Sequence, residues 1–284
     1  MIRNAAFAFI LLGYFVARPA FAQDDLSNRA QQLFQPIPTA PPELAANLST
    51  PAKVELGKML YFDPRLSASH AISCNSCHNI GLGGADAEPT SIGHRWQHGG
   101  RNAPTVFNAV FNKAQFWDGR AKDLEQQAGG PIVNPVEMAS PEPHVAEQLK
   151  GTPGYREAFD KAFPGEPNPI TLDNVQKAIA VFEATLITPN SPFDRFLKGD
   201  PNALSAIQKQ GLALFIDRGL CELPQWNQCW GRHVRPLRRG GEARCRYPPT
   251  SRQGALHGYK DRERRVCLQG PDSAQHRPDG TLLP

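Results

Sequence analysis

Several sequence features that mark particular protein classes are missing from this chain of 284 residues. After residue 22, no stretch approaches the roughly 20 apolar residues that span a bilayer, which excludes a multi-span membrane protein. No run of alternating β-branched residues favours a sheet. With 40% hydrophobic and 8% aromatic residues, the composition is that of a globular protein, which excludes disordered and fibrous classes. We therefore predict an all-α fold with long loops.

The basic bias that marks many nucleic-acid-binding proteins is absent from most of the chain. The net charge is +4, but residues 221–284 hold eleven arginines and one lysine against six acids, a local balance of +6. Residues 1–220 therefore sum to −2. Because neither part interleaves basic and aromatic residues, we expect no nucleic-acid partner.

The N-terminal segment has the three parts of a secretory signal peptide. Arg3 supplies the positive charge, residues 5–16 supply the apolar run, and Ala20-Phe21-Ala22 is a small-x-small cleavage site. We predict a signal peptide over residues 1–22 and a periplasmic protein without a membrane partner. A membrane anchor is the alternative interpretation.

Helix signals recur along the rest of the chain. Residues 24–49 are rich in proline and alanine and indicate an extended lead-in. Thr50-Pro51 predicts the start of a helix that Asp63-Pro64 ends. Ser140-Pro141 and Thr152-Pro153 each predict the start of a further short helix by the same combination of a cap and a proline.

The clearest predicted helix begins at Thr171. Its apolar residues recur at helical spacing, at Val175, Ile179, Phe182 and Leu186. Another helix is expected from about Ala203 to Gly219, which takes the position after its C-cap. The residues of this second helix that we expect to face inward are Ile207, Leu214 and Phe215.

The strongest motif is Cys74-Asn75-Ser76-Cys77-His78, the c-type haem attachment pattern Cys-x-x-Cys-His. Two thiols at this spacing can each form a thioether to one haem vinyl group, and the adjacent imidazole then becomes the proximal iron ligand. The alternatives are a redox-active cysteine pair or half of a zinc site. A zinc site needs a second Cys or His pair at matching spacing, and none occurs before residue 220.

Further motifs follow the Cys-x-x-Cys-His pattern in a fixed order. They are Ser73 to Asn79, Thr90-Ser91-Ile92-Gly93-His94, Arg101-Asn102-Ala103-Pro104-Thr105-Val106-Phe107-Asn108, Gln115-Phe116-Trp117-Asp118-Gly119-Arg120 and Val136-Glu137-Met138. With them, the chain from about Gln31 to Gly219 resembles the peroxidatic domain of the bacterial di-haem cytochrome c peroxidases. The fold that this resemblance implies is a cytochrome c-like haem domain.

The resemblance also implies roles for individual residues. His78 is the proximal haem ligand, and His94 takes the place of a sixth ligand that leaves when the partner haem is reduced. Glu137 matches the catalytic acid–base glutamate, with Gln127 as its hydrogen-bonding neighbour. The remaining two matches are Trp117, on the electron path between the two haems, and Asn102, a candidate calcium ligand. A His at position 94 distinguishes the chain from the related tyrosine-ligated branch that modifies tryptophan in another protein.

A second Cys-x-x-Cys-His is expected just after Gly219, but the sequence there reads Leu220-Cys221-Glu222-Leu223-Pro224-Gln225-Trp226. Reading the possible codons one base later permits Cys-Ala-Ser-Cys-His-Asn-Gly. We interpret residues 220–284 as a frameshifted, unstructured tail, with an authentic but unstructured tail as the alternative. Residues 23–187 are then the peroxidatic domain, and residues 188–219 the first helices of a second cytochrome c-like domain.

The resemblance implies a periplasmic enzyme that reduces hydrogen peroxide to water. Its electrons would come from a small periplasmic cytochrome c or blue-copper protein. One haem c is expected in the chain as written and two in the intact protein, with calcium and a homodimer as further candidates. Two alternatives stay open, namely an electron-transfer cytochrome without catalysis and an inactive truncated product.

Overall fold

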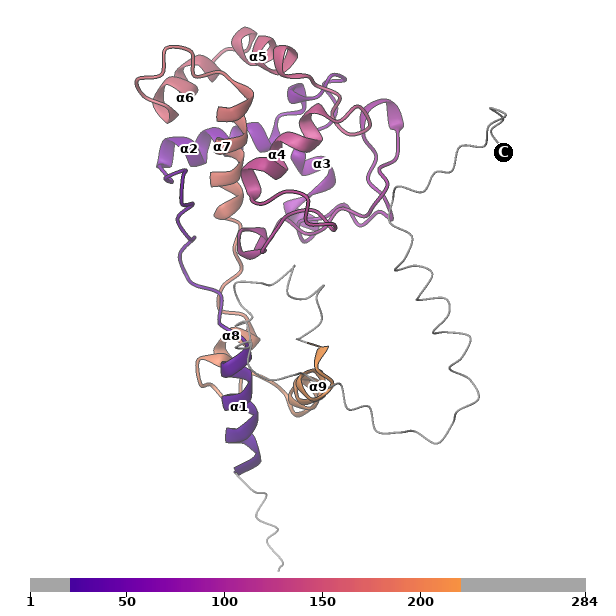
Figure 1. Cartoon of the computed structure of the whole chain (residues 1–284), viewed down its shortest axis with the longest axis vertical. Helices are drawn as coiled ribbons and strands as arrows, with labels where there is room; N and C mark the ends of the chain where they lie inside the picture. The colour runs from indigo at the N-terminus through magenta and orange to yellow at the C-terminus, as the bar shows by residue number, and fades with distance from the viewer. Residues whose placement is uncertain (1–20, 221–284) are drawn as a thin grey trace, which may run out of the picture. The chain divides into compact units, whose positions relative to one another are not determined.

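The computed structural model describes residues 21–220, and within this range every regular element is a helix (Figure 1). The α-helices are α1 (Phe21–Leu33), α2 (Pro51–Phe62), α3 (Cys74–Cys77), α4 (Leu124–Val133), α5 (Glu142–Gly151), α6 (Tyr155–Ala162), α7 (Leu172–Ala184), α8 (Pro192–Leu197) and α9 (Ala206–Asp217). The 3₁₀ turns are η1 (Pro64–Leu66), η2 (Ile80–Leu82), η3 (His94–Trp96) and η4 (Ala109–Phe111). The predicted all-α class is confirmed. Most of the predicted signal peptide and nearly all of the predicted tail lie outside the described residues.

Helices α2 and α7 form the scaffold, and the sequence predicted both of them. The Thr50 hydroxyl caps α2 by accepting from the Lys53 amide, and the Thr171 hydroxyl caps α7 by accepting from the Asn174 amide. A Cβ atom on Gly57 would lie 1.9 Å from the carbonyl oxygen of Ala178. Glycine at this position therefore lets the two helix backbones approach each other closely.

The main apolar core surrounds this helix pair. Val175, Ile179 and Phe182 are buried as predicted, and they pack in one cluster with Leu56 and Leu60 of α2. Full burial of each such side chain stabilises the fold by about 1.5–3 kcal/mol. The cluster continues into α4, α5 and α6 and so fixes the loops that leave these helices. Across the described residues, no helix is long and apolar enough to cross a membrane.

The extended lead-in predicted for residues 24–49 is wrong in its first part, because residues up to Leu33 belong to α1. The prolines begin only at Pro36, so nothing in the first ten residues of the segment interrupts a helix. Ala30 is fully buried in a cluster with Phe196, Leu197 and Leu204. Contacts with α8 and α9 thus hold α1 in place.

The helices predicted after Ser140-Pro141 and Thr152-Pro153 exist, but their predicted caps are wrong. The N-cap of α5 is Pro141 and that of α6 is Gly154, and neither has a side-chain capping bond. Ser140 is fully buried instead, while the Thr152 hydroxyl donates to the carbonyl of Gln148 at the end of α5. Each helix therefore starts one or two residues later than the local signal indicated.

The predicted inward face of α9 is wrong for two of its three residues, because only Phe215 is partly buried, with its ring centroid 6.3 Å from that of Phe34. Ile207 is 77% exposed and Leu214 is 58% exposed, whereas Leu212 and Ile216 pack toward α1 and α8. The position of α1 decides which stripe of α9 is covered, and that position is not a local property of the α9 sequence. The predicted end of the helix is confirmed, because Gly219 has the left-handed backbone angle φ of 65°.

Candidate functional site

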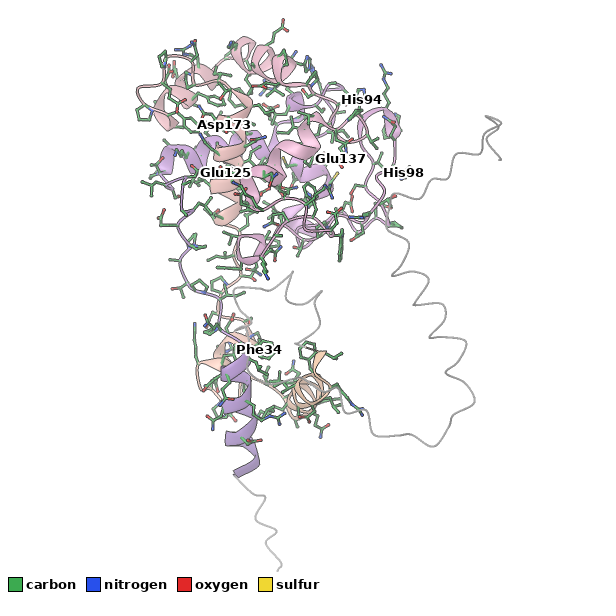
Figure 2. All side chains as sticks on the ribbon, viewed as in Figure 1. Phe34, His94, His98, Glu125, Glu137 and Asp173 are labelled. Atoms are coloured by element: carbon green, nitrogen blue, oxygen red, sulfur yellow. The ribbon has the colours of Figure 1, made fainter. Side chains whose placement is uncertain are left out.

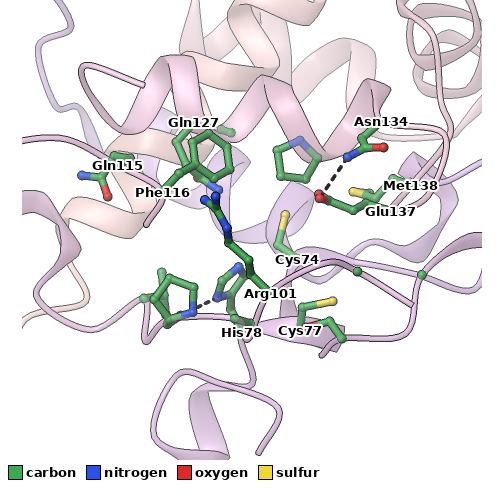
Figure 3. Close-up of a pocket in the computed structure, with 18 of the residues that line it drawn as sticks. Cys74, Cys77, His78, Arg101, Gln115, Phe116, Gln127, Asn134, Glu137 and Met138 are labelled. Atoms are coloured by element: carbon green, nitrogen blue, oxygen red, sulfur yellow. Dashed lines mark hydrogen bonds between the residues drawn. The ribbon is translucent and has the colours of Figure 1, made fainter. Parts of the chain in front are cut away.

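A cavity of about 380 Å³ opens between α3, α4 and α7 and the loops around them (Figure 3). Seven of the eight predicted site residues line it, namely Cys74, Cys77, His78, Asn102, Trp117, Gln127 and Glu137. The volume lies within the range of small-molecule and cofactor sites, which is about 300–1,000 Å³. Residues that are up to 63 positions apart in the sequence therefore share one site.

The single-turn helix α3 places the attachment motif on the cavity wall. The Ser76 hydroxyl accepts from the Ser73 amide at 3.0 Å, and the His78 amide donates to the Cys74 carbonyl at 2.9 Å. These bonds close one helical turn around the motif. Both thiols and the imidazole consequently face the same cavity.

The imidazole of His78 is held in one orientation. Its Nδ1 lies 2.9 Å from the carbonyl oxygen of Pro104, so Nδ1 carries the proton and Nε2 is left as the ligand atom. Burial lowers the pKa of His78, which favours the neutral form that binds metals. The Tyr61 hydroxyl donates to the backbone carbonyl of His78 at 2.6 Å and anchors the residue from α2.

The two thiols do not have the surroundings of a reactive cysteine pair. Both are free, and burial raises the pKa of Cys74 and of Cys77. A reactive or catalytic cysteine needs the opposite shift, because the thiolate is the nucleophile. The zinc alternative also lacks support, since the described residues hold no cluster of three or more His, Cys, Asp or Glu suited to a metal ion.

The end of α4 positions Glu137. Backbone amides of Met138 and Ser140 donate to the carbonyls of Pro131 and Ile132, which folds the loop back on the helix end. The Asn134 amide group then donates to Oε1 of Glu137 at 3.0 Å (Figure 3). Burial raises the pKa of Glu137, and Arg120 and Asn134 partly oppose that shift.

His94 is the predicted site residue that the structure does not bring to the cavity, although Gly93 beside it does line the wall. The His94 amide donates to the Glu137 carbonyl at 2.7 Å. A Cβ atom on Gly93 would lie 2.1 Å from the Val136 carbonyl oxygen, so only glycine permits this contact. Figure 2 shows His94 and Glu137 on neighbouring loops. The Nδ1 of His94 is buried without a hydrogen-bond partner among the described residues.

The remaining predicted residues lie on the opposite wall and at the cavity mouth. Trp117 is 57% exposed, and its indole nitrogen donates to the Asn102 carbonyl at 2.8 Å. The side-chain amide of Asn102 donates to the Glu88 carbonyl. Sequence reasoning missed Arg101 and Arg120, which also line the cavity and which both pair with Asp118. The feature of the sequence that could have indicated these two arginines was the group of charged residues around Trp117.

A buried carboxyl on α7 was also missed. Glu183 is 5% exposed and lines the cavity, and burial raises its pKa to about 8. The available signal was a single charge inside the apolar run from Ala178 to Ala184. Because lysine, glutamate, arginine and aspartate are rarely buried without a partner, such a charge deserves a functional explanation.

Residues 51–202 match the model of the family described as di-haem cytochrome c peroxidase. The chain belongs to this family. It is 57% identical over 203 residues to cytochrome c551 peroxidase of Pseudomonas aeruginosa, a match that covers 72% of this chain and 59% of that protein. It is 47% identical over 197 residues to cytochrome c peroxidase Ccp of Escherichia coli K12, over 69% of this chain and 40% of the relative. The chain thus spans about half the length of the relatives that it matches.

Solved structures of family members confirm the predicted cytochrome c-like fold. A crystal structure of a MauG-like protein associated with microbial copper homeostasis superposes with a TM-score of 0.58 and 28% sequence identity. That match covers 63% of this chain and 53% of the solved chain. The helices and loops that surround the cavity therefore follow the family architecture.

Proposed function

We propose that this chain carries the peroxide-reducing haem site of a periplasmic di-haem cytochrome c peroxidase. The observation that carries the proposal is the shared cavity, which holds a Cys-x-x-Cys-His turn on one wall and a half-buried glutamate on another. An electron-transfer cytochrome needs no acid–base residue there. Peroxide reduction does, because each peroxide takes up two electrons and two protons to give two water molecules.

The residues present fit a covalently attached haem. Cys74 and Cys77 would form the thioethers, and His78 would bind the iron through Nε2, since Nδ1 is engaged by Pro104. The bound haem would supply the redox centre at which peroxide is reduced. The protein would supply the orientation of His78 and a cavity lined by residues of α3, α4 and α7.

Glu137 would move the proton between the two peroxide oxygens. Its raised pKa suits this role, because an acid–base group works best when its pKa is near the working pH. The bond from Asn134 fixes one carboxyl oxygen and leaves the other free for substrate. Gln127 lines the same cavity from α4 and would help to hold the peroxide.

His94 would serve as the displaceable sixth ligand, as the family resemblance implies. In the described conformation its backbone is bound to the Glu137 segment and its side chain lies off the cavity wall. Ligation of the iron would therefore require the segment around Gly93 to move. The buried Nδ1 without a partner is consistent with a side chain that has a second binding position.

Electrons would enter at a second haem and reach the cavity through Trp117. A calcium ion held in part by Asn102 would lie between the two haem domains. The second haem would be encoded after Gly219 in the shifted reading frame, and the donor would be a small cytochrome c or blue-copper protein. The intact protein would work in the periplasm as a homodimer.

The test begins with the chain as written, expressed together with a c-type maturation system. Mass spectrometry should show one covalent haem, and the double variant Cys74→Ala/Cys77→Ala should show none. The matched control is Cys221→Ala/Cys229→Ala, which removes two cysteines outside the motif and should keep the haem. Wild type without covalent haem would contradict the proposal.

The catalytic part of the proposal is tested after deletion of one base at codon 220. The repaired protein should gain a second covalent haem and reduce peroxide. Glu137→Gln should lower its turnover by about 10²–10⁴-fold with both haems retained, because positioned proton transfer contributes about that much. Glu147→Gln, which changes an exposed carboxyl of α5, is the control. Turnover of Glu137→Gln within a few-fold of wild type would remove Glu137 from the mechanism.

A further inference from the structure

The role of Glu183 is not explained by the chemistry assigned to Glu137. Glu183 lies on α7 between buried apolar neighbours, and its side chain is 5% exposed. The small exposed part faces the haem cavity, where Glu183 shares the wall with Cys74 and Ile179. A carboxyl there indicates a partner inside the cavity.

The carboxyl group of Glu183 has no hydrogen bond and no ion pair among residues 21–220. Other buried acids among the described residues are engaged. Asp63 accepts from Arg65 and Tyr155, and Asp194 accepts from the amides of Ile37 and Ser191. Buried polar groups are nearly always satisfied, so Glu183 differs from its counterparts in a way that points to the cavity contents.

The helices packed around Glu183 bring no cation to it. The cations that line the cavity, Arg101 and Arg120, lie on loops, and both pair with Asp118. The titratable groups that act on it are Tyr61 of α2 and Cys74 of α3, and both are neutral near pH 7 because burial raises their pKa. Helix α4 contributes only Leu124, Gln127, Ala128 and Pro131 to the cavity, η4 contributes Ala109, and α5 contributes no residue. The charge state of Glu183 therefore depends on what occupies the cavity rather than on a fixed protein partner.

A haem in this cavity changes its charge by one unit when it is oxidised or reduced. In a water-poor site, a nearby carboxylate responds strongly to such a change, because Coulomb interactions are weakly screened there. Gain of an electron removes a positive charge and raises the affinity of the carboxylate for a proton. Loss of the electron has the opposite effect.

We propose that Glu183 is a proton-binding residue of the haem cavity, which takes up one proton when the haem gains an electron and releases it when the haem loses that electron. The inference rests on the proposed function, since it requires haem at Cys74 and His78. The electron comes from the donor protein and the proton from solvent, so each one-electron reduction adds one proton to the carboxylate. Burial raises the pKa of this carboxyl to about 8, which is near physiological pH.

The experiment compares wild type with Glu183→Gln, which keeps the size and polarity of the side chain and removes the titration. Both proteins are first shown by mass spectrometry to carry covalent haem. The midpoint potential of the haem is then measured by spectroelectrochemical titration from about pH 5 to about pH 9. The reduction equilibrium constant of wild type should fall with rising pH, by at most about tenfold per pH unit. This dependence should be lost, or clearly reduced, in Glu183→Gln.

Glu137→Gln removes a second glutamate of the cavity and serves as the matched comparison. The pH dependence that Glu183→Gln removes should persist in Glu137→Gln. Equal pH dependence in wild type and Glu183→Gln, with covalent haem present in both, would overturn this inference and leave the proposed function intact. Absence of covalent haem from wild type would contradict the proposed function itself.

A second measurement decides the matter if Glu183→Gln does not fold. Infrared redox difference spectra of Glu137→Gln, labelled with ¹³C-glutamate, report the protonation of the remaining glutamates directly. Reduction should produce the carbonyl band of a protonated glutamic acid at the labelled frequency. A spectrum without such a band would overturn the inference.

Discussion

Helices α7 and α9 begin with the same kind of N-cap, but they differ in how much of each helix is buried. Each starts at a hydroxyl N-cap, Thr171 or Ser205, and each runs for about three turns. Nine residues of α7 are buried, whereas no residue of α9 is buried in the part of the chain that the structure describes. Local sequence is therefore enough to start both helices, but only packing partners from elsewhere in the chain decide how much of each is covered.

The largest difference between the two helices should appear in the pH dependence of stability, because α7 carries the buried Glu183. Its folded pKa of about 8 lies above the ordinary value of 4.5, so between these values the folded protein binds more protons than the unfolded one. The contribution of Glu183 to the free energy of unfolding should be greatest below about pH 4.5. This contribution should fall as pH rises toward about 8, by on the order of 5 kcal/mol.

Denaturant titrations of wild type and Glu183→Gln at a series of pH values measure this effect. The variant should lose most of the decline, and the exposed-carboxyl variant Glu147→Gln should retain it. The stability of wild type could instead rise between about pH 5 and about pH 8, with the same profile in Glu183→Gln. That result would show that the carboxyl is not buried as described.

The second expected effect is a contrast between two identical substitutions. Ile179→Ala in α7 removes a side chain that is 1% exposed, and it should lower the free energy of unfolding by about 3 kcal/mol. Ile207→Ala in α9 removes one that is 77% exposed, and it should change stability by less than about 0.5 kcal/mol. Denaturant midpoints at a single pH provide the measurement. Equal losses in the two variants would mean that α9 is covered as completely as α7.

The smallest expected effect concerns two helical glycines, for which the same substitution should lower stability in one helix and raise it in the other. Gly57→Ala in α2 would place a Cβ against the Ala178 backbone, and it should cost about 1–3 kcal/mol. Gly211→Ala in α9 meets nothing within 4 Å and should stabilise its helix by up to about 1 kcal/mol. Thermal unfolding compares the two. Stabilisation by both substitutions would contradict the close contact of α2 with α7.

Local signals predicted the parts of the fold that depend on neighbours in sequence. Thr50-Pro51 and Asp63-Pro64 gave the bounds of α2, and the apolar stripe beginning at Val175 gave the buried face of α7. The attachment motif was equally local, because five consecutive residues define it. The cavity shared by Cys74, Gln127 and Glu137 followed from the family resemblance rather than from spacing alone.

Other features could not be predicted because distant segments determine them. The exposed face of α9 depends on where α1 packs, and the start of α5 depends on the burial of Ser140. Glu183 was not predicted as a site residue, because a helical pattern is identified from its apolar positions alone. A charged residue between those positions does not contribute to the pattern. The direction of the His94 side chain likewise depends on the docking of its loop to Glu137.

The contact between Gly93 and the Val136 carbonyl has a consequence for protein engineering. With the His94 amide also bonded to the Glu137 carbonyl, residues 91–98 and 134–138 meet at two backbone contacts, and the Gln97 side chain adds a bond to the Pro135 carbonyl. Side-chain substitutions can do little to adapt one segment to a foreign partner at the two backbone contacts, since main-chain atoms make the fit there. In a chimera of two family members, these segments should be exchanged as one transplantable unit, although 35 residues separate them in sequence.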